Sequence, residues 1–229
     1  MDISRFQPPL ADLNTHVWRI VPSRFPPTSI FDRIADTADI DAVFEIEGRT
    51  NDRLREEAGL ISLVPPDDRV SGPGTTPIMA AFTHINDKGA RFSDSTYGAY
   101  YAAFEVITAV EETKHHRQIF LAATHEAPID IDMRVYRAWL TASAHDVRGG
   151  TPAEIYHPGN YSVSQRFAAR LRREGSNGLI YDSVRHAGGT CVAVFRPRLL
   201  CDCCQERHLT YRWDGTRITD VYEKRSFNF

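Results

Sequence analysis

The stretch Ala99–Glu112, A-Y-Y-A-A-F-E-V-I-T-A-V-E-E, decides the fold of this 229-residue chain. Its first residues are aromatic and small, and they predict a short buried strand over Ala99–Ala102. From Phe104 the apolar residues recur at helical spacing, so we predict a helix over Phe104–His116. A strand therefore runs almost directly into a helix at this point.

The flanking sequence supplies more strands than helices. A second, basic-faced helix is predicted over Tyr161–Arg173, a weaker one over Arg49–Ala58, and the proline- and glycine-rich Val64–Pro77 is predicted to be a loop. The strand candidates are short and β-branched or aromatic: His16–Val21, Gln118–Ala123, Ile129–Ile131, Leu179–Tyr181, Cys191–Phe195, His208–Trp213 and Arg217–Tyr222. Short strands with long connections and few helices predict an α+β fold with a mixed sheet.

The composition indicates a folded, cytoplasmic protein. Hydrophobic residues make up 42% and charged residues 25% of the chain, which is close to globular averages. The net charge of −3 argues against nucleic acid as a direct partner. No apolar run approaches the roughly 20 residues that span a bilayer, and the first residues do not resemble a signal peptide, so no membrane partner is expected.

Three of the four cysteines fall within Cys201–Cys204. Cys201, Cys203 and Cys204 could bind zinc with His208 as the fourth ligand, although a second half-site of the usual spacing is missing. The alternative is a cysteine-rich turn between strands. No metal is expected.

Four local signals carry the functional hypothesis. Arg19 lies within an apolar strand, Arg91 lies in a glycine-bounded turn, and Ser183 ends a strand. Tyr101 lies on the predicted strand and Glu112 on the predicted helix. Glu112 lies near the apolar face of that helix, where burying a carboxylate is costly unless it has a partner or a function. A strand-edge arginine, a hairpin tip and a strand-end serine are the alternatives for the other three.

Taken together and in order, these segments resemble the RES domain family, whose members include toxins of bacterial toxin–antitoxin pairs. The closest match is to the family's Leu-Tyr-Leu-Ala and Thr-Ala-Leu-Ala-Glu, which align without a gap on Tyr100–Ala103 and Thr108–Glu112. Gly178–Arg185 is similar to the family's Gly-Ile-x-Tyr-Pro-Ser-Val-Arg. Trp18-Arg19 matches an aromatic-Arg pair, and Gly89–Ser93 is a looser match to Gly-Arg-aromatic-Asn.

The departures are confined to single positions. Trp18 stands where tyrosine is more usual, Ala90 and Ser93 replace a glycine and an asparagine, and Asp182 replaces a proline. The change at Ala90 puts the backbone geometry of that turn in question.

The resemblance implies one RES-like domain over residues 1–229 with an ADP-ribosyltransferase-like fold. Its recognisable core would cover 17–197, with a divergent insertion at about 32–77 and a cysteine-containing β tail at 198–229.

The resemblance also implies that NAD⁺ is the substrate. Glu112 would be catalytic, together with Arg19 and Tyr101, and Arg19, Arg91, Tyr101 and Ser183 would bind the dinucleotide. No glycine-rich phosphate loop is present, so arginines would have to hold the pyrophosphate. A guanidinium group can do so through paired hydrogen bonds to phosphate oxygens. A carboxylate suits the positive charge that develops on the ribose.

Three functions stay open at this point. The first is an NAD⁺ glycohydrolase or phosphorylase toxin, which implies a protein antitoxin, often of the helix-turn-helix type. The second is a mono-ADP-ribosyltransferase that modifies a specific protein acceptor. The third is a non-catalytic nucleotide-binding or zinc-dependent interaction module around Cys201–His208.

Overall fold

The computed structural model describes residues 3, 5–23, 31–34, 36–40, 42, 59–150 and 152–227. The predicted helix over Arg49–Ala58 lies outside these residues. Three α-helices have described bounds: α3 (Thr76–Thr83), α4 (Val106–Ala123) and α5 (Ser162–Arg173). None of the described helices has the length and apolar character needed to cross a membrane.

The strands form a mixed sheet in the order β1-β2-β5-β4-β3-β6-β7. Their bounds are β1 Leu10–Pro22, β2 Tyr100–Ala103, β3 Ile129–Asp146, β4 Gly178–Asp182, β5 Thr190–Val194, β6 Leu200–Trp213 and β7 Ile218–Lys224. The β3–β4 pair is parallel, and the other named pairs are antiparallel. The predicted α+β class with a mixed sheet is confirmed.

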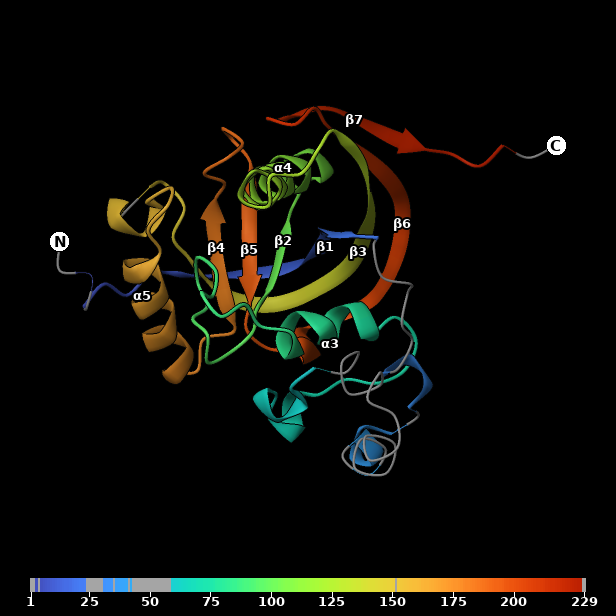
Figure 1. The fold of residues 1–229 in the computed structure, drawn as a ribbon. Helices are drawn as coiled ribbons and strands as arrows, with labels where there is room; N and C mark the ends of the chain where they lie inside the picture. Colours follow the sequence, from blue (N-terminus) through green and yellow to red (C-terminus); the bar gives the residue numbers. More distant parts are fainter. Residues whose placement is uncertain are drawn as a thin grey trace.

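The sheet folds back on itself because β1 has two partners. It pairs with β3 along its whole length, from Leu10↔His145 to Pro22↔Met133, and with β2 at Trp18↔Ala103. In Figure 1, α4 lies above β2 and β5, α3 lies below them, and α5 lies beside β4.

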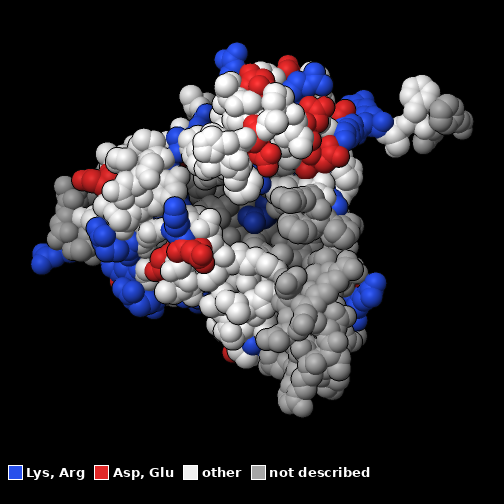
Figure 2. Space-filling model, viewed as in Figure 1, with Lys and Arg blue, Asp and Glu red and all other residues white. Residues whose placement is uncertain are grey.

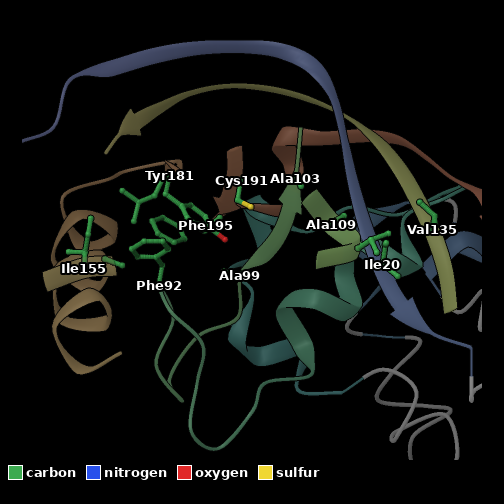
Figure 3. Packing of buried hydrophobic residues seen from close by; sticks show 14 of the residues in the cluster. Ile20, Phe92, Ala99, Ala103, Ala109, Val135, Ile155, Tyr181, Cys191 and Phe195 are labelled. Atoms are coloured by element: carbon green, nitrogen blue, oxygen red, sulfur yellow. The ribbon is translucent and has the colours of Figure 1, made fainter. Parts of the chain in front are cut away.

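Two hydrophobic cores occupy the two faces of this sheet. The first packs α4 and α5 on the sheet, and Figure 3 shows it running from Ile155 and Phe92 to Ile20 and Val135. The second core lies between the sheet and α3 and includes Tyr100. Alternation along β2 sends Tyr101 and Ala103 to the first core and Tyr100 and Ala102 to the second.

Most predicted elements are present, with corrections. The predicted strand over Gln118–Ala123 is wrong, because these residues are the last turns of α4. The predicted Ile129–Ile131 strand is only the start of β3, which continues to Asp146. The cysteine-rich turn is also wrong, because Cys201–Cys204 lies within β6. The predicted loop over Val64–Pro77 contains a 3-10 turn, Pro66–Asp68, and the start of α3.

Candidate active site

A carboxylate and a hydroxyl meet where α4 faces the end of β4. Ser183 Oγ donates to Glu112 Oε1 over 2.6 Å. The same oxygen accepts from the backbone N–H groups of Arg185 and His186, at 3.1 and 2.9 Å. Because both amides point at the oxygen, the single hydroxyl proton is directed at the carboxylate. Ser183 therefore holds Glu112 in one orientation.

The loop that follows Ser183 is closed by its own backbone. Ser183 N–H donates to the carbonyl of Gly189 over 2.8 Å, and Gly189 N–H donates to the carbonyl of His186 over 2.9 Å. The His186 Nδ1 atom lies 2.9 Å from Thr108 Oγ1, in the first turn of α4. Thr108 is the first residue of the Thr108–Glu112 motif and His186 directly follows the Gly178–Arg185 motif, but neither was among the predicted site residues.

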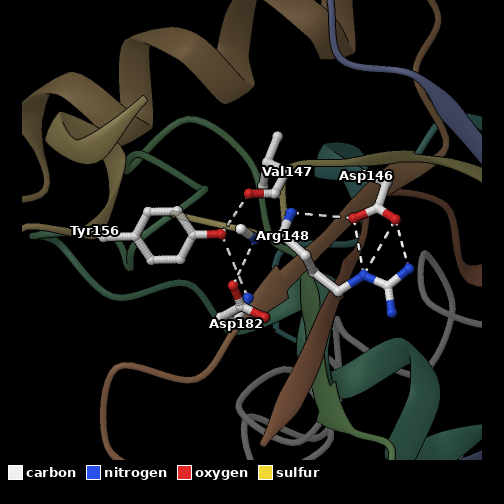
Figure 4. A network of polar contacts seen from close by, with 6 residues as sticks. Asp146, Val147, Arg148, Tyr156 and Asp182 are labelled. Carbon is white, nitrogen blue, oxygen red and sulfur yellow. Dashed lines mark hydrogen bonds and ion pairs between the residues drawn. The ribbon is translucent and has the colours of Figure 1, made fainter. Parts of the chain in front are cut away.

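A network of polar contacts fixes the end of β4 from its other side (Figure 4). The Tyr156 hydroxyl donates to the carbonyl of Val147 over 2.6 Å and accepts from Asp182 N–H at 3.4 Å. The Asp182 carboxylate accepts from Gly149 N–H over 2.7 Å. Asp182, which stands where the family usually has proline, is thus held in place directly before Ser183.

Tyr101 ties β2 to the turn that carries Arg91. Its hydroxyl accepts from Phe92 N–H over 2.9 Å and lies 3.1 Å from Ser93 Oγ. Burial raises the pKa of Tyr101 to about 12, so the hydroxyl is protonated at neutral pH. Gly89 has φ +67° and a Cβ there would lie 2.2 Å from the Ser93 carbonyl oxygen, so glycine is needed at this position.

Arg91 is buried and braces the segment before α5. Its Nη1 donates to the carbonyls of Ile155 and His157, at 3.0 Å each. Its guanidinium carbon lies 4.7 Å from the centre of the Tyr161 ring. A guanidinium carries five N–H donors, so these two bonds do not exhaust its capacity to bind an anion.

Arg19 reaches the site from the opposite face of the sheet. Its guanidinium carbon lies 5.0 Å from the centre of the Tyr100 ring, on the α3 side, and its Nη1 donates to the carbonyl of Tyr101 over 3.1 Å. Its buried Nε has no hydrogen-bond partner among the described residues. Burial lowers the pKa of Arg19 from its ordinary value. The structure therefore groups Arg91, Tyr101, Glu112 and Ser183 on the α4 side and joins Arg19 to them through β2.

Two histidines on α4 lie near Glu112. Burial, followed by the charge of Arg185, lowers the pKa of both His115 and His116. The sequence predicts a helix that ends at His116, but α4 continues to Ala123, so both histidines lie within the helix and not at its end. Glu111, beside them, pairs with Lys114 at 2.9 Å, and both side chains are half-buried.

The structure does not assemble the candidate zinc ligands. Cys203 is buried, whereas Cys201 and Cys204 are exposed. His208 lies four residues beyond Cys204 on the same strand, which is roughly 13 Å at the usual rise. Zinc ligands lie about 2.0–2.3 Å from the metal, so this separation is too long. No metal-holding group of His, Cys, Asp or Glu occurs within the described part of the chain.

The surface is hollowed beside α4. Figure 2 shows this hollow over the β2 and β5 region, with Lys or Arg atoms at its bottom. A separate cavity of about 580 Å³ adjoins the end of β4 and is lined by Phe6, Pro9, Asp146, Arg148, Gly149, Asp182 and Thr190. None of the five predicted site residues lines that cavity.

Comparison with known proteins identifies a matching family model, a similar relative and a similar solved structure. A family model described as RES domain matches residues 67–214, which include Arg91, Tyr101, Glu112 and Ser183 but not Arg19. "Uncharacterized protein y4oC" of Sinorhizobium fredii is 33% identical over 210 residues, 90% of this chain and 86% of the relative. The crystal structure of the M. tuberculosis MbcT–MbcA toxin–antitoxin complex contains a chain that is 10% identical, with a TM-score of 0.44, covering 88% of this chain and 86% of that one.

Proposed function

Because the chain belongs to the RES domain family, we propose that it cleaves the bond between nicotinamide and ribose in NAD⁺, as a glycohydrolase or a phosphorylase. The observation that carries the proposal is the 2.6 Å hydrogen bond from Ser183 to Glu112. It joins Thr108–Glu112 and Gly178–Arg185, two of the motifs that carry the resemblance to this NAD⁺-consuming family. Arg91 and Tyr101 lie on the same side of the sheet, so the site has cationic, aromatic and acidic groups together.

The chemistry requires a negative charge beside the sugar. When neutral nicotinamide leaves, the ribose acquires oxocarbenium character, and a fixed carboxylate stabilises that charge more in the transition state than in the ground state. Glu112 is the proposed group, acting through a ribose hydroxyl or on the attacking water or phosphate. Ser183 contributes by holding this carboxylate still, and its own contact with NAD⁺ stays a prediction.

The dinucleotide needs separate groups for its other parts. We propose that Arg91 binds the pyrophosphate, because guanidinium groups form paired, charge-assisted hydrogen bonds with phosphate oxygens. Arg19 lies on the other face of the sheet, so we propose that it supports the site indirectly, by holding β2 through the Tyr101 carbonyl. The Tyr101 hydroxyl is engaged by the Gly89–Ser93 turn, so we propose that its ring, which is only partly buried, contacts the nicotinamide.

The family resemblance also leads us to propose a toxin–antitoxin role with a protein antitoxin, often of the helix-turn-helix type. Expression of the wild-type chain should arrest growth and deplete cellular NAD⁺, and Glu112→Gln should do neither. Growth arrest by both proteins at equal abundance would contradict this role.

The reaction itself is tested by incubating purified protein with NAD⁺, with and without phosphate, and separating the products. Free ADP-ribose indicates hydrolysis, and a phosphorylated ADP-ribose formed only with phosphate indicates phosphorolysis. Labelled NAD⁺ in a lysate reports the alternative, since transfer to one protein band would assign an ADP-ribosyltransferase. Unchanged NAD⁺ in all three conditions would refute the proposed function.

A further inference from the structure

We propose that Thr108 and His186 form a positioning pair that fixes the Ser183–Gly189 loop on α4 and so orients Glu112. The pair makes a hydrogen bond of 2.9 Å between Thr108 Oγ1 and His186 Nδ1. Its effect on catalysis rests on the proposed function, whereas its effect on the loop does not. Neither side chain is assigned a contact with substrate.

The helix presents two anchor points to the loop. Thr108 and Glu112 are four residues apart on α4, so they lie on one face, one turn from each other. Glu112 bonds the first residue of the loop, Ser183, and Thr108 bonds the side chain of its fourth residue, His186. Two bonds at separate points prevent the loop from pivoting about the first one.

The Thr108–His186 contact is tightly packed. Thr108 is completely buried. A Cβ on Gly189 would lie 2.6 Å from Thr108 Oγ1 and 2.7 Å from His186 Nδ1. Such distances are far inside van der Waals contact, so the backbone at Gly189 lies directly against the pair. The loop's closing residue is thus seated on the same two side chains that bond each other.

The same loop determines the direction of the Ser183 hydroxyl. The amides of Arg185 and His186 both donate to Ser183 Oγ, so a displaced His186 moves one of these donors. A shift of about 1 Å would lengthen the Ser183–Glu112 contact beyond ordinary hydrogen-bond range. Misplacement by about 1 Å is also enough to cost up to about 10²-fold in rate.

The test compares two disrupting variants with matched controls. Thr108→Val keeps the shape and removes the hydroxyl, and His186→Leu removes the ring nitrogen. Thr113→Val is the control on the same helix, because Thr113 bonds the Tyr211 hydroxyl at 2.7 Å. His145→Leu is the control for the imidazole, because His145, on β3, has its Nδ1 atom 2.8 Å from Ser176 Oγ in the segment before β4.

A conservative variant separates positioning from general loss of structure. His186→Asn places an amide atom at the position of Nδ1, so it can restore the bond to Thr108. We expect Thr108→Val and His186→Leu to lower kcat for NAD⁺ cleavage about tenfold or more with KM within twofold. His186→Asn should recover most of that loss, and both controls should keep kcat within twofold.

Hydrogen exchange gives a readout that does not depend on NAD⁺. The Arg185 and His186 amides should exchange at least tenfold faster in Thr108→Val and His186→Leu, and at wild-type rates in the controls. If wild-type protein leaves NAD⁺ intact, the proposed function fails and exchange alone decides the pairing. Unchanged exchange at both amides, or kcat within twofold of wild type in an active protein, would overturn the inference.

Discussion

Ser183→Ala is the change that best isolates the contact on which the site depends. It removes the hydroxyl that donates to Glu112 over 2.6 Å and leaves the carboxylate in place. The amides of Arg185 and His186 lose their acceptor, but this loop is only partly buried and water can replace it. The expected consequence is a carboxylate that samples several orientations while the fold persists.

The magnitude follows from the kind of bond that is lost. A hydrogen bond to a charged group contributes about 1.5–3 kcal/mol. If the whole amount appears in the transition state, at about 1.36 kcal/mol per tenfold, kcat falls roughly 10- to 150-fold. KM should change little, since the bond is made within the protein. Ser183→Thr keeps the hydroxyl and should retain most of the activity.

The assay is steady-state nicotinamide release by four proteins: wild type, Ser183→Ala, Glu112→Gln and the double variant. Because Ser183 acts through Glu112, Ser183→Ala should cost much less in the Glu112→Gln background than in wild type. Two results would refute the reasoning. One is a kcat for Ser183→Ala within twofold of wild type, and the other is full additivity in the double variant.

Two further predictions concern stability and titration. Gly189→Ala forces a methyl group against Thr108 and His186 and should lower the free energy of unfolding by about 1–3 kcal/mol in urea titration, and an unchanged value would contradict the packing. Burial lowers the pKa of His115 and His116, so the folded state favours their neutral rings. Their contribution to stability is therefore fully present above about pH 6.5 and is lost as the pH falls through the lowered values; ring-proton NMR that shows titration at or above 6.5 would contradict this.

The end of α4 could not be assigned from local composition. Ile119 and Phe120 belong to a β-prone run, yet both are exposed, whereas Leu121 is buried in the core. Leu121 lies eleven residues after the buried Val110, which is about three helical turns. The helical spacing becomes evident only when Leu121 is known to pack in the core, because the local sequence alone resembles a strand.

The length of β3 was not predicted because different parts of the strand pack in different cores. Met133 and Val135 pack in the α4-side core, and Ala138 and Leu140 pack in the α3-side core. The strand thus changes the face that it buries along its length, and its sequence does not show one continuous alternation. Tertiary packing determines where β3 ends, and short stretches of sequence do not contain that information.

The site was predicted in part. Motif order indicated Glu112 and Ser183, and the structure joins them directly. Arg19 lies on the other face, because alternation in β1 places it on the side of the α3 core. Thr108 and His186 were missed because a buried threonine and a loop histidine carry no signal until the loop is folded against the helix.

The most direct measurement is the rate of nicotinamide release by Glu112→Gln relative to wild type, with NAD⁺ affinity measured for both. Glutamine preserves the size of the side chain and can still accept from Ser183, so the variant removes only the charge. We predict a rate at least about 10²-fold lower with NAD⁺ affinity nearly unchanged, as expected for a group that stabilises the transition state. Equal rates for the two folded proteins would contradict the assignment of this carboxylate to the chemistry.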